Sequence, residues 1–315
     1  MKLEPCVPPL WAASGHTQTI LGHILPSPRL RSKGKRVEIA VSGGDRLIGF
    51  VQEGTSNTIV YVFHGLAGST DSAYMHRTSM LAQKMGHGVI LLNHRGCGEG
   101  AGLASGPYHS GRAEDLSAAI AFGRSQFPRH RHVAVGFSMS GNALLLLQSG
   151  RRGETKPDAA IAFNAPIHLE RCSKLLSRGF NRLYDAKFYR QCRRDALRNS
   201  ENTFLKGSLP RFSTIYEFDR HFTAPAGGFA DREEYYATCS TLELLREIST
   251  PTMVVTAKDD PFVPYDSYAT AQFSNAVRFH AEEFGGHMGY ISRAKTPLGT
   301  RRWQDYAVSE ALRSI

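Results

Sequence analysis

Beyond residue 50, the hydrophobic positions form short continuous runs that alternate with stretches of helical spacing. Near-continuous apolar runs are typical of strands in a parallel sheet, because helices cover both faces of such a sheet. Helical spacing near 73–85, 111–126, 139–150 and 265–273 predicts helices between the strands. Six runs predict strands: "TIVYVFHG", "GVILLNHRG", "HVAVGFS", "DAAIAFNAP", "PTMVVTAKDD" and "NAVRFHAEEFGGH".

An antiparallel hairpin precedes this alternation. Residues 36–54, "RVEIAVSGGDRLIGFVQEG", read as two strands around a Ser-Gly-Gly-Asp turn. The first 36 residues are rich in Pro and Gly and are expected to wrap the surface. The pattern predicts an α/β fold with a doubly wound, mostly parallel sheet behind an N-terminal antiparallel hairpin. The chain has 315 residues and no long linker, so we expect a single domain over residues 1–315.

One interval, residues 168–248, interrupts the alternation between two predicted strands. It is basic and aromatic, and its apolar residues recur at helical spacing. Ligand chemistry in open α/β sheets gathers at the carboxyl ends of the strands, which is where this interval is inserted. We therefore expect a helical lid insertion over 168–248. An extra packing layer without a gating role is the alternative.

Composition indicates a soluble globular protein, with 41% hydrophobic and 21% charged residues. The longest aliphatic run, residues 143–147, is far shorter than a membrane span requires. The N-terminus "MKLEPCVPPLW" lacks the apolar stretch of a signal peptide. Five cysteines are scattered without metal-ligand spacing. A reduced, cytoplasmic protein is the expected class.

The net charge of +10 is concentrated in two places. Residues 168–206 contain ten Lys/Arg and four Asp/Glu, and "RLRSKGKR" covers residues 29–36. Basic clusters can bind nucleic acid, anionic lipid or acidic substrates, and they are also common on solvated helix faces. No zinc-finger, RRM or helix-turn-helix signature is present, so no nucleic-acid partner is expected. Peripheral contact with an anionic membrane remains open.

Residues 132–141, "HVAVGFSMSG", run from a predicted strand straight into a predicted helix, with Ser138 at the junction. A Ser on a strand-to-helix turn of the G-x-S-x-G kind is a nucleophile elbow. It needs small residues two positions before and after the Ser. Gly136 meets this requirement, and Ser140 stands in place of the usual second Gly. Ser138 could simply cap the helix, but a buried strand precedes it, a helix follows, and an Asp and a His come later in the hydrolase order Ser, Asp, His.

The partners of Ser138 come from two later strand ends. In "VVTAKDDPFVP" two adjacent carboxylates end a strand, and neighbouring side chains in extended chain point opposite ways. We assign Asp260 as the acid because D-x-x-V-P is usual after such a strand, with Asp259 as the alternative. His287 in "FGGHMGY" is assigned as the base, since flanking glycines leave its ring free to reach the elbow. The sequence thus predicts a Ser138–Asp260–His287 triad.

The stretch "FHGLAGS" predicts the oxyanion hole. The backbone N–H groups of Leu66 and Met139 would point at the developing alkoxide, and the start of the Met139 helix adds positive potential. His64 is interpreted as a supporting hydrogen-bonding residue. Cys97 is a nominal second nucleophile, but a small structural residue in a tight loop fits it better. No H-E-x-x-H, C-x-x-C or P-loop motif is present, so neither a metal nor a cofactor is expected.

Taken together, several motifs resemble the YheT-like branch of the α/β-hydrolases, AB hydrolase family 4. The resemblance covers roughly residues 8–290 and implies a serine hydrolase of carboxylic esters, including acylglycerol lipases of lipid metabolism. The implied triad again falls on Ser138, Asp260 and His287, whereas Ser140 departs from the common G-x-S-x-G-G. Eukaryotic relatives often carry an N-terminal membrane anchor, and none is expected here. The motifs are "PPLWAASGHTQTI", "HGLAGS", "NHRGCGEG", "YHSGRAEDL", "GFSMSGN", "DDPFVP" and "GGHMGY".

These observations predict a serine esterase that cleaves carboxylic esters through an acyl-enzyme intermediate. An alcohol replacing water in the second step would make it an acyltransferase. A non-catalytic binding module on the same fold would predict a broken triad, and all three residues are retained. We expect a small-molecule substrate, a short- to medium-chain acyl ester or an acylglycerol. Four aromatic side chains of the insertion fit either an acyl pocket or ordinary core: Phe180, Phe188, Phe204 and Phe212.

Overall fold

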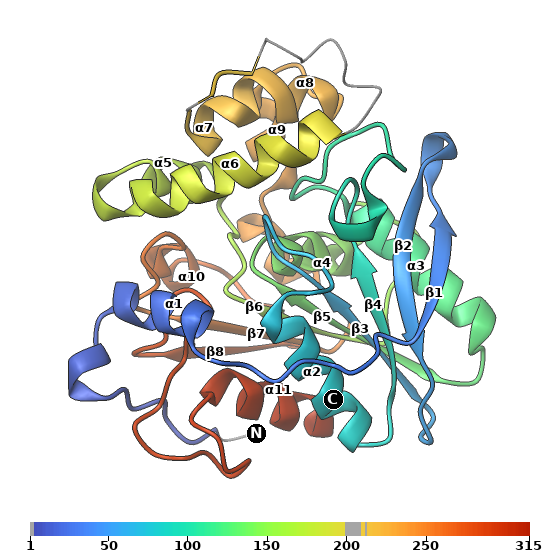
Figure 1. Cartoon of the computed structure of the whole chain (residues 1–315), viewed down its shortest axis with the longest axis vertical. Coiled ribbons are helices and arrows are strands. Elements are labelled where there is room, and N and C mark those ends of the chain that lie inside the picture. Colours follow the sequence, from blue (N-terminus) through green and yellow to red (C-terminus); the bar gives the residue numbers. More distant parts are fainter. Residues whose placement is uncertain (1–2, 199–208, 212) are drawn as a thin grey trace.

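The computed structural model describes residues 3–198, 209–211 and 213–315. Its centre is an eight-stranded sheet in the order β1-β2-β4-β3-β5-β6-β7-β8 (Figure 1). All pairs from β4 to β8 are parallel, whereas β1–β2 and β2–β4 are antiparallel. The strands are β1 (Lys35–Ala40), β2 (Arg46–Gln52), β3 (Thr58–Phe63), β4 (Gly88–Asn93), β5 (Arg131–Phe137), β6 (Ala159–Phe163), β7 (Thr252–Ala257) and β8 (Val277–Glu282).

The predicted fold class is confirmed, including the N-terminal hairpin. The Ser-Gly-Gly-Asp turn joins β1 to β2, and β2 also pairs with β4, so the hairpin extends the parallel sheet at one edge. Strands β4, β6 and β7 are buried along their whole length, which explains why their sequences are continuously apolar.

Helices cover both faces of the sheet. On one face, α2 (Ala73–Lys84) and α11 (Trp303–Ser314) share a core with side chains of β3, β5 and β7. On the other face, α3 (Ala113–Gln126) and α4 (Met139–Ser149) pack on the alternate residues of β3 and β5. α10 is shorter than expected and covers Tyr265–Ala269. The period of two along each strand therefore divides the core into two layers.

Two helices lie where the sequence pattern suggested none, α1 (Gly15–Ile24) and α11. α1 begins after Ser14, whose side chain accepts a hydrogen bond from the Thr17 N–H. Its Gln18 is fully buried and binds the backbone of Ile291 through both ends of its amide. Tertiary contacts of this kind hold α1, because its own sequence has little apolar periodicity.

Between β6 and β7 the described residues of the 168–248 insertion are mostly helical (Figure 1). They form a layer of their own above the sheet, with a core made by Cys172, Tyr189 and Phe218 against Val254 of β7. The helices are α5 (Leu169–Leu176), η4 (Gly179–Asn181), α6 (Arg182–Arg198), α7 (Ile215–Phe218), η6 (Asp219–Thr223), α8 (Ala224–Ala226), α9 (Arg232–Cys239) and η7 (Leu242–Glu247).

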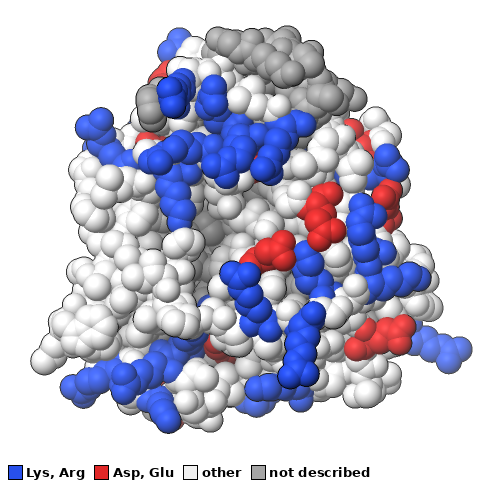
Figure 2. Space-filling model, viewed as in Figure 1, with Lys and Arg blue, Asp and Glu red and all other residues white. Residues whose placement is uncertain are grey.

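Basic side chains gather over α6 on the face shown in Figure 2. This helix carries six Lys or Arg and two Asp, so it accounts for much of the positive segment noted in the sequence. Across the described residues, no helix combines the length and the apolar character needed to cross a membrane.

Candidate active site

The turn between β5 and α4 holds Ser138 in a conformation that non-glycine residues rarely adopt, with φ 53° and ψ −121°. Such strain is typical of a nucleophile elbow, which lifts the hydroxyl out of the sheet. The helix returns so closely that a Cβ on Gly136 would lie 2.6 Å from the Ser140 carbonyl oxygen. The requirement for a small residue at position 136 is therefore steric.

The structure brings the three predicted residues into one hydrogen-bonded row. His287 Nε2 lies 2.9 Å from Ser138 Oγ, and His287 Nδ1 lies 2.8 Å from Asp260 Oδ2. The other Asp260 oxygen accepts the backbone N–H groups of Phe262 and Val263, at 3.1 and 3.0 Å. The Asp260 carboxylate is buried, and the Phe262 ring packs 4.2 Å from the His287 ring. Ring and carboxylate are thus held in a fixed relative orientation.

Asp259, the alternative acid, binds backbone and not the imidazole. Its Oδ1 accepts the N–H groups of Gly285 and Gly286, both at 2.8 Å. Burial raises the pKa of this carboxyl above its ordinary value, and the two backbone donors oppose that shift. Asp259 therefore fixes the loop that leads to His287, while Asp260 faces the ring.

Asn164 is a site residue that the sequence analysis missed. It follows β6, is fully buried and has a positive φ of 46°. Its Nδ2 donates to Asp260 Oδ2 at 2.8 Å and to the Gly286 carbonyl at 3.2 Å, and its Oδ1 accepts the Tyr290 hydroxyl at 2.9 Å. A signal was available, because Asn164 is the first polar residue after an apolar strand at the carboxyl edge of the sheet.

Thr19 of α1 is a second missed residue. Its Oγ1 accepts the backbone N–H of His287 at 2.8 Å and donates to the Gly15 carbonyl at 2.7 Å. The approach is close, since a Cβ on Gly286 would lie 2.2 Å from the Gly15 carbonyl oxygen, and Gly286 has φ 55°. The N-terminal helix thus helps to position the loop that carries His287.

Of the two predicted oxyanion donors, Met139 follows Ser138 directly, and Leu66 follows Gly65, where a Cβ would lie 2.9 Å from Ser138 Cβ. Met139 is the first residue of α4, so its N–H has no acceptor inside the helix. The Leu66 N–H, after β3, likewise has no protein acceptor within the described ranges. Both residues line the same cavity. Two backbone N–H groups without a protein acceptor in the described ranges therefore belong to residues that line one cavity.

The sequence pattern of the family described as "alpha/beta hydrolase fold" matches residues 58–294, more than half of the chain. The chain belongs to the α/β-hydrolase family. The matched range contains Ser138, Asp260 and His287.

Relatives of this α/β-hydrolase include proteins named as esterases and lipases. "Putative esterase YheT" of Escherichia coli is 33% identical over 259 residues, covering 80% of this chain and 75% of that protein. "Phospholipase ABHD3" of Mus musculus is 26% identical over 304 residues, covering 91% and 74%. The solved Pyrococcus furiosus esterase Pf2001 superposes with a TM-score of 0.60 at 17% identity, covering 92% of this chain and 99% of that one. The last likeness concerns the fold.

Ser140 is more than a small residue in this hydrolase. Its buried hydroxyl contacts His94 Nε2 at 2.6 Å, Tyr108 Oη at 2.9 Å and the His64 carbonyl. The His94 backbone N–H in turn donates to His64 Nε2 at 3.2 Å. Burial lowers the pKa of His64 to about 4 and that of His94 well below its ordinary value, so both rings are neutral at pH 7. This hydrogen-bonded network holds the turn that carries Ser138, and His64 is part of the network.

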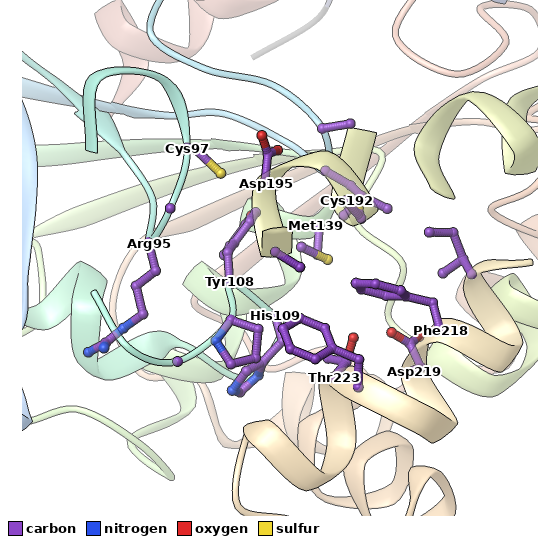
Figure 3. A pocket seen from close by; sticks show the side chains of 18 of the residues that line it. Arg95, Cys97, Tyr108, His109, Met139, Cys192, Asp195, Phe218, Asp219 and Thr223 are labelled. Atoms are coloured by element: carbon purple, nitrogen blue, oxygen red, sulfur yellow. The ribbon is translucent and has the colours of Figure 1, made fainter. Parts of the chain in front are cut away.

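A cavity lies between Met139, at the start of α4, and the insertion, and its lining includes neither Ser138 nor His287 (Figure 3). It encloses about 720 Å³ of space between protein atoms, part of which is open to solvent. Leu66 and Met139 lie at its sheet end, and Phe218 and Phe222 come from the insertion. Asp219 also lines it, and burial raises the pKa of this carboxyl to about 6. The cavity is thus largely apolar, with a few polar groups.

Two of the four aromatic residues offered for an acyl pocket, Phe180 and Phe188, do not line this cavity. Phe180 is 49% exposed and packs edge-on against His16, and Phe188 packs on Phe262. Phe204 and Phe212 lie outside the described residues. Helical spacing identified aromatic positions, but it does not say which face of a helix meets the cavity.

The cysteines are unpaired thiols, and four of the five are buried. Cys97 lines the cavity, and burial raises the pKa of its thiol far above the ordinary value. A thiol in such surroundings stays protonated and is a poor nucleophile. Cys97 therefore fits a structural role.

Proposed function

We propose that this α/β-hydrolase cleaves carboxylic esters with Ser138 as nucleophile, His287 as general base and Asp260 as the acid that orients the imidazole. What supports the assignment above all is the row Ser138 Oγ, His287 Nε2, His287 Nδ1 and Asp260 Oδ2, with contacts of 2.9 and 2.8 Å. Contacts of this length let a proton pass from the hydroxyl to the imidazole as the hydroxyl attacks. Asp260 stabilises the imidazolium that forms and stays ionised itself.

The acyl-enzyme forms in two steps. Ser138 Oγ bonds to the ester carbonyl carbon while His287 takes its proton, and the carbonyl oxygen becomes an oxyanion. The N–H groups of Leu66 and Met139 are assigned to bind this oxyanion, and one such donor is worth about 3 kcal/mol. The intermediate then expels the alcohol, which takes the proton from His287.

Release of the acyl group repeats these two chemical steps, with water as the nucleophile in place of Ser138. Water gives up a proton to His287 and attacks the acyl carbon, and Ser138 leaves with the proton returned by His287. An alcohol in place of water would give a new ester, so hydrolysis and acyl transfer share every protein group. Adding a primary alcohol to the assay and measuring how the acyl group partitions separates the two outcomes.

We assign short- to medium-chain acyl esters or acylglycerols as substrates. The cavity supports this, because its lining is largely apolar and the side chains of Phe218 and Phe222 suit an acyl chain. Phe218 and Phe222 belong to the insertion 168–248, so we assign this insertion as a lid over the cavity. We assign residues 1–315 to a single domain. The names of the relatives, an esterase and a phospholipase, agree with an ester substrate. Five unpaired thiols are consistent with a reducing compartment such as the cytoplasm.

The decisive experiment is labelling with a fluorophosphonate probe, which reacts with activated serines. The wild-type protein should be labelled and should hydrolyse p-nitrophenyl esters, with rates that depend on acyl length. Ser138→Ala should lose both properties. Ser149→Ala, which changes a serine at the other end of α4, is the matched control and should retain both. Equal labelling of wild type and Ser138→Ala would refute the assignment, and no labelling of wild type would favour a binding module.

A further inference from the structure

Large hydrophobic side chains that face solvent are concentrated in one part of the described molecule. Eight of them are exposed, and seven belong to two short segments, 7–24 and 180–183. Several of these side chains are mostly exposed: Leu10 is 89% exposed, Trp11 is 72% exposed and Leu183 is 61% exposed. Scattered single apolar residues are normal on a surface, but a cluster of them marks an interaction site. The seven are Val7, Leu10, Trp11, Ile20, Ile24, Phe180 and Leu183.

The helix α1 of the first segment lies against the second segment and the start of α6. The His16 ring of α1 is 4.7 Å from the Phe180 ring and stacks on Tyr184 of α6 at 5.8 Å. Two turns further along α1 and one turn further along α6, His23 Nε2 lies 2.6 Å from Lys187 Nζ. We call the seven exposed hydrophobic residues named above the apolar flank.

The two stripes of α1 have different roles. Gly15, Thr19 and Gly22 face the loop of His287, where a Cβ on Gly22 would lie 2.5 Å from Gly289. Ile20 and Ile24 lie one and two turns beyond His16 on the stripe beside α6 and remain exposed. The exposure of these isoleucines is thus built into the way α1 is docked.

Positive charge borders the apolar flank. α6 carries six basic residues, and none of them forms an ion pair with a carboxylate of the described residues. One of its two acidic residues, Asp185, is buried and accepts the Ile215 N–H. Figure 2 shows the blue side chains gathered over α6, with a nearly uncharged area below and to the left, where α1 lies in Figure 1. The basic row consists of Arg182, Lys187, Arg190, Arg193, Arg194 and Arg198.

We propose that the apolar flank and the basic row of α6 form one docking surface for a lipid bilayer that contains anionic lipids. Exposed Trp and aliphatic side chains enter the boundary between headgroups and acyl chains, while neighbouring Lys and Arg contact lipid phosphates. The contacts are side-chain tips spread over two elements. This arrangement suits a fluid surface that adapts to them.

The docking surface is connected to the candidate active site. Tyr184 and Phe188 of α6 pack on Phe262, with ring centroids 5.5 and 6.0 Å apart, and Phe262 packs on His287. Through Thr19, α1 holds the backbone of the same His287. A protein bound in this way would present its active-site side to the bilayer. The inference concerns binding, and it does not depend on the reaction proposed above.

The chain offers an internal probe for the test, because it contains two Trp residues. Trp11 is 72% exposed, and Trp303 is 1% exposed. Vesicles of phosphatidylcholine with phosphatidylglycerol should shift the Trp11 emission to shorter wavelength and protect it from acrylamide. Trp11→Phe should still sediment with the vesicles but should show no shift, since only the buried Trp303 remains. An unchanged emission and unchanged quenching of the wild-type protein with excess vesicles would overturn the proposal.

Charge and apolar contact are tested separately by cosedimentation. The double change Arg190→Gln and Arg194→Gln should weaken binding roughly fivefold for each charge removed. Arg46→Gln with Arg313→Gln, which removes two exposed charges from β2 and α11, should leave the binding unchanged.

The apolar contact is tested by a second double variant. Leu10→Ser with Leu183→Ser should abolish the shift in Trp11 emission. Equal binding to pure phosphatidylcholine, or equal loss in both arginine variants, would contradict the proposal. A Trp11 shift that follows protein concentration without vesicles would assign the surface to a second copy and would also overturn it.

Discussion

The side-chain amide of Asn164 donates a hydrogen bond of 2.8 Å to Asp260 Oδ2, the same oxygen that lies 2.8 Å from His287 Nδ1. The second Asp260 oxygen accepts two backbone N–H groups. The carboxylate is therefore held at both oxygens, and it cannot rotate away from His287 without breaking buried hydrogen bonds. Asn164 is a positioning residue, since it acts on His287 through Asp260.

Replacing Asn164 should impair turnover more than substrate binding. Asn164→Ala leaves Asp260 Oδ2 with His287 as its side-chain partner, and kcat should fall roughly tenfold to a hundredfold with little change in KM. Asn164→Asp adds a carboxylate that favours the charged imidazole, so the acidic limb of the kcat/KM profile should move to higher pH. Tyr290→Phe, which removes only the partner of Asn164 Oδ1, is the comparison and should have a smaller effect. Unchanged kcat and pH profile in both Asn164 variants would exclude the positioning role.

Replacing the two adjacent aspartates one at a time should lower kcat by clearly different factors. Asp260→Asn should lower kcat by about 10⁴-fold, because the amide favours the wrong imidazole tautomer. Asp259→Asn keeps an oxygen that can accept from Gly285 and Gly286, so kcat should fall by less than about tenfold. Steady-state hydrolysis of a p-nitrophenyl ester measures both. A larger loss in Asp259→Asn would assign the acid to the other carboxylate.

Ser140 should matter for stability more than for rate. Ser140→Gly restores the residue usual at an elbow but leaves His94 Nε2 and the His64 carbonyl without their buried partner. The free energy of unfolding should fall by about 1–3 kcal/mol, while kcat at low temperature stays within a few fold. Urea unfolding measures the first quantity. Ser149→Gly on the same helix controls for helix propensity, since its hydroxyl makes only a local bond.

The hydroxyl of Thr19 should be needed for full activity. Thr19→Val keeps the shape of the side chain and removes the acceptor of the His287 N–H, so the loop of His287 should lose about 1–3 kcal/mol of local stability and kcat should fall. Thr19→Ser retains the acceptor and should restore most of the rate. Hydrogen exchange of residues 285–289 checks the mechanism. If Val and Ser at this position behave alike, the hydroxyl has no such role.

Acid should destabilise the fold through the buried histidines. The pKa of His64 is lowered from 6.5 to about 4 by burial, so its neutral form stabilises the folded state above pH 6.5. That contribution, about 3 kcal/mol, is lost as the pH falls from 6.5 through 4. Urea midpoints at neutral and acidic pH should differ less in His64→Gln than in wild type. His221→Gln, which changes an exposed histidine, should behave like wild type.

Much of the architecture was predictable because burial leaves a direct trace in the sequence. Strands covered on both faces have to be apolar throughout, and this places β3 to β7 within a few residues of the predicted runs. Turn residues located the hairpin in the same way. α1 left no such trace, because its fit to the His287 loop depends on small residues and hydrogen bonds and not on an apolar stripe.

For the candidate site, the residues before and after Ser138, the order Ser, Asp, His and the alternation at Asp259 and Asp260 were enough to name three side chains and one alternative. Only the tertiary structure decided which aspartate faces His287, because β7 ends at Ala257 and both aspartates lie in the turn that follows, where strand alternation no longer applies. It alone revealed Asn164 and Thr19, which reach Asp260 and His287 from segments distant in sequence. The structure also showed that Phe218 and Phe222 line the cavity, whereas Phe180 and Phe188 do not. Periodicity defines the faces of a helix, but only packing decides which part of the protein each face contacts.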